Sequence, residues 1–167
     1  WSLASEDGAT ATCSNGSVAL TQQGMEATRH TDRLFLISGI NVQAHTTTPV
    51  ISWLRRERAA GTPLGAICSG AYVFAKAGFL DGVETAVHWA WHDLFLEEFP
   101  EVRLVRNVFG ARPKIITASG GTAAADLMLH LISKANGADL ATEVADQMVY
   151  NAVREGTAAQ RVSLQSR

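Results

Sequence analysis

The sequence predicts an α/β protein with a mostly parallel sheet sandwiched between helices. Short, continuous apolar runs predict strands that are buried on both faces. Stretches with helical periodicity follow these runs, so strand and helix alternate, which implies βαβ crossovers. With 167 residues, 47% of them hydrophobic, the chain is long enough to bury the core of one such domain.

Apolar runs give the limits of the expected strands, and capping residues give the limits of the expected helices. Arg33–Ser38 is a strand that ends at Gly39, and a helix begins at Thr48 as its N-cap, with Pro49 in the first turn. The other expected strands are residues 1–5, 16–20, 64–67, 85–87, 102–105 and 115–117. The other expected helices are residues 69–77, 88–99 and 123–135, and a last amphipathic helix that carries Leu140, Val144 and Met148.

The two ends of the chain are less regular. A doubly wound sheet usually has its first strand near the centre, and no strand here fills that place, so we expect one strand and one helix upstream of Trp1. From Glu155 the sequence is polar and loses its periodicity, which predicts a linker or a frayed end.

Composition limits the classes of function. A net charge of −2 argues against a nucleic-acid-binding surface on this segment, because phosphate contacts require basic residues. Cys13 and Cys68 are too few for a disulfide framework or a zinc knuckle, which favours a reducing compartment. No apolar run approaches membrane-spanning length, and no leader precedes the first strand. We expect a cytoplasmic protein.

The most informative stretch is Leu64–Ala71, in which a strand ends at a cysteine between small residues and a helix follows at once. Small neighbours are what a sharp strand-to-helix turn requires, with Cys68 in strained backbone as in a nucleophile elbow. The N-terminus of the helix would favour the thiolate of Cys68. The alternative is that Cys68 is a small buried hydrophobic residue.

Ligands of open α/β sheets bind at the carboxyl ends of the strands. Four strand ends carry groups capable of chemistry: Gly39, Cys68, His88 and the loop Ser119–Thr122. A nucleophile, an imidazole and backbone donors would therefore meet at one edge of the sheet.

Three blocks in order carry a family resemblance: Gly65–Ala71, Ala77–Trp89 and Ala118–Asp126. They resemble the nucleophile elbow, the AGLLDG…T-x-HW block and the SAGGTA…D block of the DJ-1/PfpI superfamily, which has the class I glutamine amidotransferase-like fold. The resemblance implies a flavodoxin-like three-layer domain with a nucleophile elbow at Cys68.

The His88-Trp89 pair narrows the resemblance to one branch, the sensor domains that precede the AraC-type DNA-binding domains of bacterial regulators. Cys13–Gly16 and Gln160–Leu164 are similar to regulators of arginine, carnitine and glycine-betaine catabolism. The resemblance implies a ligand-sensing domain over residues 1–154 and, over 155–167, a linker toward a helix-turn-helix domain outside this chain.

What the resemblance implies for function is transcription regulation by a non-catalytic, homodimeric sensor. The effector would be an amino acid or a betaine-like amine, and DNA would be bound only by the absent domain. No cofactor, metal or membrane partner is expected. The expected ligand-binding residues are Gly39, Ile40, Cys68, Ser69, His88, Trp89, Gly120 and Gly121.

Individual residues also allow plainer interpretations. His88 either lies beside Cys68 in the pocket or caps a helix. His88 and His92 have the i, i+4 spacing of a metal-binding pair, but no glutamate follows His88 and the sequence offers no third ligand for zinc. Trp89 either offers its face to a quaternary ammonium group or packs in the core, whereas Trp91 is expected to pack in the core. Asp126 and His130, one turn apart, are expected to form a hydrogen-bonded structural pair, and Cys13 is expected to be structural.

Two departures from the family pattern weaken the case for catalysis. Ile40 follows Gly39 where many relatives have a second glycine, and the acidic partner of the cysteine belongs to the upstream unit that is not in this sequence. Two alternatives stay open: a cysteine hydrolase of the same fold, isonitrile hydratase-like or amidase-like, and a redox or glyoxalase-type stress protein in which Cys68 is oxidised.

Overall fold

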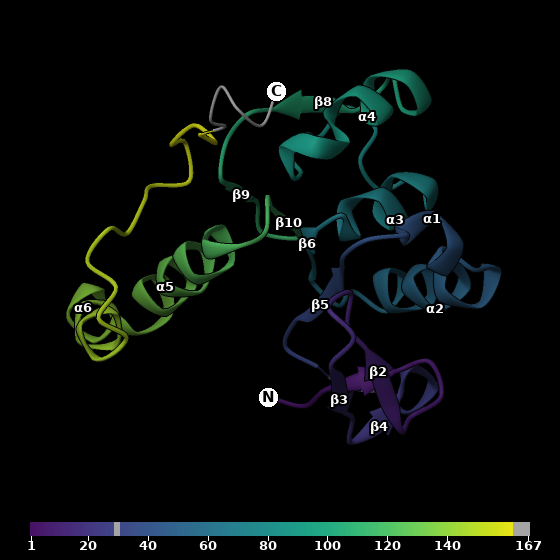
Figure 1. The fold of residues 1–167 in the computed structure, drawn as a ribbon, viewed down its shortest axis with the longest axis horizontal. Helices are drawn as coiled ribbons and strands as arrows, with labels where there is room; N and C mark the ends of the chain where they lie inside the picture. Colours follow the sequence, from purple (N-terminus) through teal and green to yellow (C-terminus); the bar gives the residue numbers. More distant parts are fainter. Residues whose placement is uncertain (29–30, 162–167) are drawn as a thin grey trace.

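The central sheet is built from the apolar runs that the sequence predicts as strands. The computed structural model describes residues 1–28 and 31–161. The strand order is β5-β6-β10-β9, in which β5, β6 and β10 are parallel and β9 is antiparallel to β10 (Figure 1). These strands are β5 (Leu34–Ser38), β6 (Leu64–Cys68), β9 (Phe109–Ala111) and β10 (Ile115–Ala118). The predicted α/β class is confirmed.

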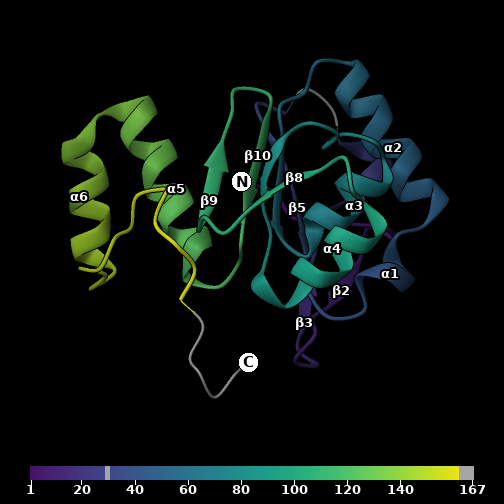
Figure 2. The same ribbon diagram turned by 90° about the horizontal axis from the view of Figure 1, so that it is seen from above.

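Helices cover both faces of this sheet. Figure 2 shows α5 and α6 on one side and α1 to α4 on the other. The helices are α1 (Val42–His45), α2 (Thr48–Ala59), α3 (Gly70–Lys76), α4 (His92–Glu98), α5 (Thr122–Asn136) and α6 (Ala138–Gln147), with 3-10 turns η1 (Met25–Ala27) and η2 (Trp89–Trp91). The chain is therefore a three-layer α/β sandwich, as predicted.

Two helix starts differ from the prediction. The N-cap of α2 is Thr47 rather than Thr48, because the Thr47 hydroxyl accepts a hydrogen bond from the Val50 amide at 3.4 Å. Residues 88–99 were expected to form one helix, but η2 and α4 divide that segment between them. The His88 ring accepts a hydrogen bond from the Ala90 amide and so closes a tighter first turn.

The hydrophobic core has two parts, one on each side of the sheet. The larger cluster joins the sheet to the helices α1 to α4 and includes Leu54, Leu64 and Phe74, whereas the smaller one includes Ile116 and Leu127 under α5. Burial on both faces was predicted for residues 33–38, and this is wrong at Ile37, which is 67% exposed because β5 lies at the edge of the sheet. The central strand β6 has the buried pattern instead.

The N-terminal region forms two small sheets, drawn in purple in Figure 1. β1 (Ala4–Ser5) is parallel to β4 (Gln23–Gly24), and β2 (Thr10–Thr12) forms a hairpin with β3 (Val18–Leu20). The strands predicted over 1–5 and 16–20 are shortened, and the hairpin partner β2 was not predicted. Three-residue strands carry too little alternation to be recognised in a sequence.

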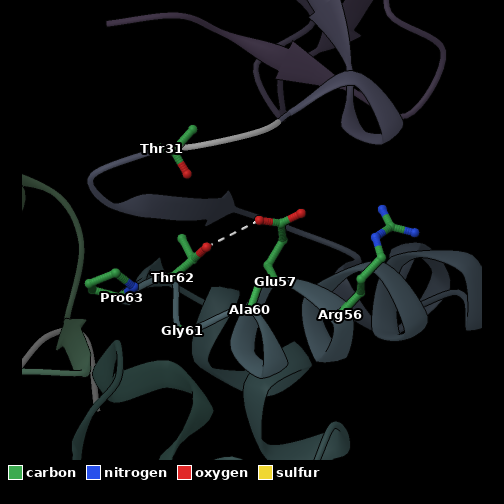
Figure 3. A pocket seen from close by; sticks show the side chains of 7 residues that line it. All are labelled: Thr31, Arg56, Glu57, Ala60, Gly61, Thr62 and Pro63. Carbon is green, nitrogen blue, oxygen red and sulfur yellow. Dashed lines mark hydrogen bonds between the residues drawn. The ribbon is translucent and has the colours of Figure 1, made fainter.

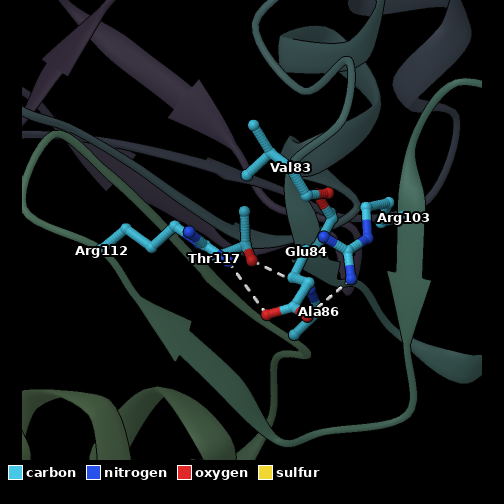
Figure 4. A network of polar contacts seen from close by, with 7 residues as sticks. Val83, Glu84, Ala86, Arg103, Arg112 and Thr117 are labelled. Atoms are coloured by element: carbon cyan, nitrogen blue, oxygen red, sulfur yellow. Dashed lines mark hydrogen bonds and ion pairs between the residues drawn. The ribbon is translucent and has the colours of Figure 1, made fainter.

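A second pair of parallel strands, β7 (Glu84–Ala86) and β8 (Arg103–Val105), is connected to the central sheet by polar contacts. Glu84 forms ion pairs with Arg103 at 3.2 Å and with Arg112 at 3.0 Å (Figure 4). The Ala86 amide donates to the Thr117 hydroxyl at 2.9 Å in the buried interior. Because Thr117 lies in β10, this bond holds the end of β7 beside the end of β10.

Part of the polar C-terminal segment contacts the sheet. The Val108 amide donates to the Ala158 carbonyl at 2.9 Å, and Asn107 forms an antiparallel bridge with Ala159. That 155–167 serves as a linker stays a prediction, and residues 162–167 lie outside the described ranges. The first residues of this C-terminal segment pair with the chain beside β9, whereas the sequence predicted a linker or a frayed end.

Candidate functional site

The ends of β6 and β10 meet in a very close backbone contact. Cys68, the last residue of β6, has a φ of 60° in the left-handed region, which L-residues rarely adopt. Gly120, two residues after β10, has a φ of 89°, and a Cβ added to it would lie 2.7 Å from Cys68 Cβ and 3.0 Å from Cys68 Sγ. Only glycine fits there, so the loop after β10 lies directly on the cysteine.

Ser69 ties the ends of β5 and β6 together. Its side chain is fully buried, and its hydroxyl donates to the Gly39 carbonyl at 2.6 Å. The structure thus places the predicted residues Gly39, Cys68, Ser69 and Gly120 in one cluster. Ile40, by contrast, is 69% exposed.

The electrostatic setting of Cys68 differs from the prediction. Burial raises the pKa of the Cys68 thiol, and a backbone hydrogen bond from Ser69 opposes this only in part. The expectation that the N-terminus of the following helix would favour the thiolate is therefore wrong. Burial disfavours the charged thiolate, and Gly120 lies close against the cysteine. That Cys68 is a nucleophile is not supported by this setting.

A pocket of about 200 Å³, hereafter the carboxyl-end pocket, opens beside this cluster. Three parts of the chain line it: the turn after β7, the loop that leads into α5, and the C-terminal segment. The lining residues are His88, Trp89, Ser119, Gly120, Gly121, Thr122, Ala123, Arg154, Gln160 and Arg161. Of the predicted site residues, four line this pocket, and Cys68 lies behind one of them, Gly120.

His88 has the capping role that the sequence offered as the plainer alternative, and its predicted place beside Cys68 stays a prediction. It lines the carboxyl-end pocket, and its Nδ1 accepts a hydrogen bond from the Ala90 amide at 3.3 Å. Burial lowers the pKa of His88, and the nearby His92 lowers it further. The lowered pKa favours the uncharged ring of His88, whose centroid lies 5.3 Å from that of Trp89. Trp89 itself is 38% exposed and available to a ligand.

Asp126 has a different partner from the one predicted. It accepts hydrogen bonds from the Arg154 amide at 2.9 Å, from Arg154 Nε at 2.8 Å and from the Tyr150 hydroxyl at 2.9 Å. Arg154 Nη2 also lies 2.6 Å from the carboxylate, whose side chain is fully buried. The expected pair with His130 is therefore wrong, and His130 packs against the ring of Phe109.

This ion pair positions a pocket residue. Arg154 Nη2 donates to the Thr122 hydroxyl at 2.8 Å, so the guanidinium is held at the first turn of α5. Sequence reasoning missed Arg154, Gln160 and Arg161 as pocket residues. The Gln160-Arg161 pair belongs to a stretch that we had interpreted only as a connection, and no local signal shows that it folds back.

The other aromatic and polar expectations are also placed by the structure. Trp91 packs at the edge of the larger core cluster, as predicted. His92 Nε2 is 3.2 Å from the Val87 carbonyl oxygen. Across residues 1–28 and 31–161, no group of three His, Cys, Asp or Glu side chains could hold a metal ion. No helix among these residues is long and apolar enough to cross a membrane.

The sequence is similar to a known protein family and to several known proteins. Residues 1–134 match the DJ-1/PfpI family. The HTH-type transcriptional regulator CdhR of Pseudomonas aeruginosa is 35% identical over 167 residues, which is 100% of this chain and 50% of that protein. The HTH-type transcriptional regulator ArgR of the same species is 39% identical over 136 residues, 81% of this chain and 41% of that protein.

Two further comparisons bear on the fold and on the enzymatic alternative. The isonitrile hydratase of Pseudomonas putida is 32% identical over 103 residues, 60% of this chain and 43% of that enzyme. A crystal structure of an AraC family transcriptional regulator from Pseudomonas putida superposes with a TM-score of 0.73 at 22% identity, covering 88% of this chain and 80% of that one. The chain spans about half the length of the curated regulators that it matches.

Proposed function

This chain belongs to the DJ-1/PfpI family, and from that premise we propose that it is the effector-sensing domain of an AraC-type transcription regulator. The observation that carries the proposal is the match to the regulator CdhR along the whole chain. Two such regulators align at 35% and 39% identity, and each extends well beyond the aligned part.

The carboxyl-end pocket suits a small zwitterion as the effector. Arg161 brings a guanidinium group to the pocket lining, which favours a carboxylate. The exposed part of Trp89 offers an aromatic face to a quaternary ammonium group, an attraction of about 0.5–2 kcal/mol. We therefore propose an amino acid or a betaine-like amine as the effector class.

The setting of Cys68 supports binding rather than turnover. Burial raises the pKa of its thiol, so that the nucleophilic thiolate is disfavoured at neutral pH. Ile40 follows Gly39 and adds a side chain beside the backbone amide that an oxyanion would have to reach. The competing function, a cysteine hydrolase, has support from the similarity to isonitrile hydratase.

The proposal extends to domain organisation and partners. Residues 1–154 would form the sensor, completed upstream by one strand and helix, and residues 155–167 would lead to a DNA-binding helix-turn-helix domain. A homodimer would match the paired half-sites that such regulators read. Light scattering at micromolar concentration tests the dimer, and a monomer alone would contradict it.

A thermal-shift screen with parallel activity assays tests the sensor against the hydrolase. Glycine betaine, L-carnitine and L-arginine are the probes, since a ligand that binds only the folded state raises the melting temperature. We expect one of them to stabilise the chain, and Cys68→Ser to retain its affinity within about tenfold, or about 1.4 kcal/mol. Turnover of isonitriles or amides that Cys68→Ser abolishes, with no stabilising amine, would instead favour the hydrolase.

A further inference from the structure

The C-terminal segment does two things at once: it leads out of the domain and it forms one wall of the carboxyl-end pocket. Gln160 and Arg161 line this pocket together with His88 and the loop before α5. In the proposed regulator, these two residues begin the connection to the DNA-binding domain. A ligand in the pocket would therefore touch the connection itself.

Backbone bonds add this segment to the sheet as an extra antiparallel stretch. The Val108 amide donates to the Ala158 carbonyl at 2.9 Å, and the Gln160 amide donates to the Arg106 carbonyl at 2.8 Å. Gly156 packs flat on Phe109, since a Cβ there would lie 2.7 Å from its ring. The apolar side chains of this stretch, Ala158 and Ala159, are small and can bury little apolar area, so we expect it to open more readily than the core strands.

The side chain of Gln160 joins the segment to the pocket. Its Nε2 donates to the carbonyl of Val87 and to that of Asn107, each at 2.9 Å. Val87 immediately precedes the pocket residue His88, and Asn107 lies just before β9. One amide group thus holds together the turn after β7, the start of β9 and the outgoing segment.

We propose that effector binding in the carboxyl-end pocket fixes residues 156–161 against the sheet, and that Gln160 is the residue that couples the two events. This inference rests on the proposed sensor function. A ligand that contacts both the fixed wall and the segment makes its full set of contacts only when the segment is docked. Linkage then requires that docking strengthens binding by the same factor by which binding strengthens docking.

The charge of Arg161, within residues 156–161, indicates which end of the effector this segment holds. The positive charge of Arg154 is balanced by Asp126, with which it is paired at 2.6 Å. Arg161 adds a second guanidinium to the pocket lining. A carboxylate would therefore be placed at the segment, and an analogue without it would bind without fixing the segment.

The experiment combines hydrogen exchange with affinity measurements on the 167-residue chain. Exchange is followed at the Val108 and Gln160 amides, with and without whichever of glycine betaine, L-carnitine or L-arginine stabilises the protein. Choline, which keeps the quaternary ammonium but lacks the carboxylate, is the ligand control. Gln160→Ala is compared with Gln147→Ala, an exposed glutamine on α6.

We expect the effector to slow exchange at both amides about tenfold or more, and choline to leave exchange unchanged. Gln160→Ala should speed exchange in the free protein and weaken effector binding about tenfold, or about 1.4 kcal/mol, whereas Gln147→Ala should do neither. An effector that binds wild type and Gln160→Ala equally well, without protecting the segment, would overturn this inference and leave the sensor function standing. Failure of all three probes to bind the wild type would contradict both.

Discussion

Two pockets lie at opposite ends of the central sheet and differ in size and chemistry. The amino-end pocket, of about 410 Å³, lies before β5 and β6 and is lined by Thr31, Arg56, Glu57 and residues 60–63 (Figure 3). The carboxyl-end pocket has about half that volume, 200 Å³, and lies after β7 and β10. We nevertheless place the effector in the smaller one.

This difference indicates that the direction of the helices bordering a pocket, rather than the volume of the pocket, identifies the effector site in this fold. The last turn of α2, the negative end of its dipole, borders the amino-end pocket, whereas the first turn of α5, the positive end of its dipole, borders the carboxyl-end pocket. Glycines with positive φ allow the backbone to approach the second pocket closely, at Gly120 and Gly121. A ligand with a carboxylate is therefore favoured only at the carboxyl end.

Each pocket also has a buried carboxylate next to it, and the two are held differently. Asp126 is 1% exposed and is held by Arg154 and Tyr150, which contact both of its oxygens. Glu57 is 5% exposed, and from the described residues its side chain accepts a hydrogen bond from the Thr62 hydroxyl at 3.3 Å. The acid beside the carboxyl-end pocket is thus part of the framework that positions a pocket residue.

The largest expected effect is on the stability of the two carboxylate variants. Asp126→Asn leaves Arg154 without its charge partner and should lower the free energy of unfolding by about 3–5 kcal/mol. Glu57→Gln should change it by about 1 kcal/mol or less, because the hydrogen bond from Thr62 that it alters is a long one. Urea denaturation of both variants measures the difference. Equal losses would show that the two pockets do not differ in this respect.

A glycine pair tests the close contact that shapes the carboxyl-end pocket. Gly120→Ala combines a positive φ with a Cβ that would clash with Cys68, and should destabilise by about 2–4 kcal/mol. Gly78 has a similar φ of 75° but no atom within 4 Å of an added Cβ, so Gly78→Ala should cost about 1 kcal/mol. Melting temperatures compare the two, and an equally mild Gly120→Ala would contradict the packing argument.

Alkylation rates test the burial of the thiol behind Gly120. Cys13 is exposed, whereas Cys68 is partly buried with a raised pKa, so iodoacetamide should label Cys13 first at pH 7. Raising the pH to 9 should speed the labelling of Cys68, because more of it becomes thiolate. Mass spectrometry of peptides follows both sites. Rapid labelling of Cys68 below pH 7 would restore the activated-nucleophile interpretation.

The smallest expected effect is a pH dependence that comes from the histidines beside the carboxyl-end pocket. Burial lowers the pKa values of His88 and His92 below the ordinary value of 6.5. As the pH falls below about 6.5, the unfolded chain binds protons first, so stability is full above that pH and is lost as the pH falls through the lower folded values. Urea denaturation at pH 7.5, 6.5 and 5.5 should show this loss, and His88→Gln should reduce it. A free energy of unfolding that increases as the pH falls would contradict this prediction.

The sequence predicted the elements whose signal is local. Continuous apolar runs located β5, β6 and β10, and glycines and prolines located the ends of most helices. It missed β9, because Phe109–Ala111 is three residues long and becomes a strand only by pairing with β10. The carboxyl-end site was located by a topological rule, which needs only the order of strands and helices.

By itself, the sequence determined the alternation of strands and helices and the small residues that permit the turn at Cys68, whereas the contact of Gly120 with Cys68 comes from the tertiary structure. Only the tertiary structure decided that Asp126 pairs with Arg154, 28 residues later in the chain, rather than with its helical neighbour His130. The tertiary structure also decided that Gln160 returns to the pocket and that burial raises the pKa of the Cys68 thiol. The physical reason is that periodicity and backbone preference are properties of neighbouring residues, whereas burial and charge pairing depend on segments that only the folded chain brings together.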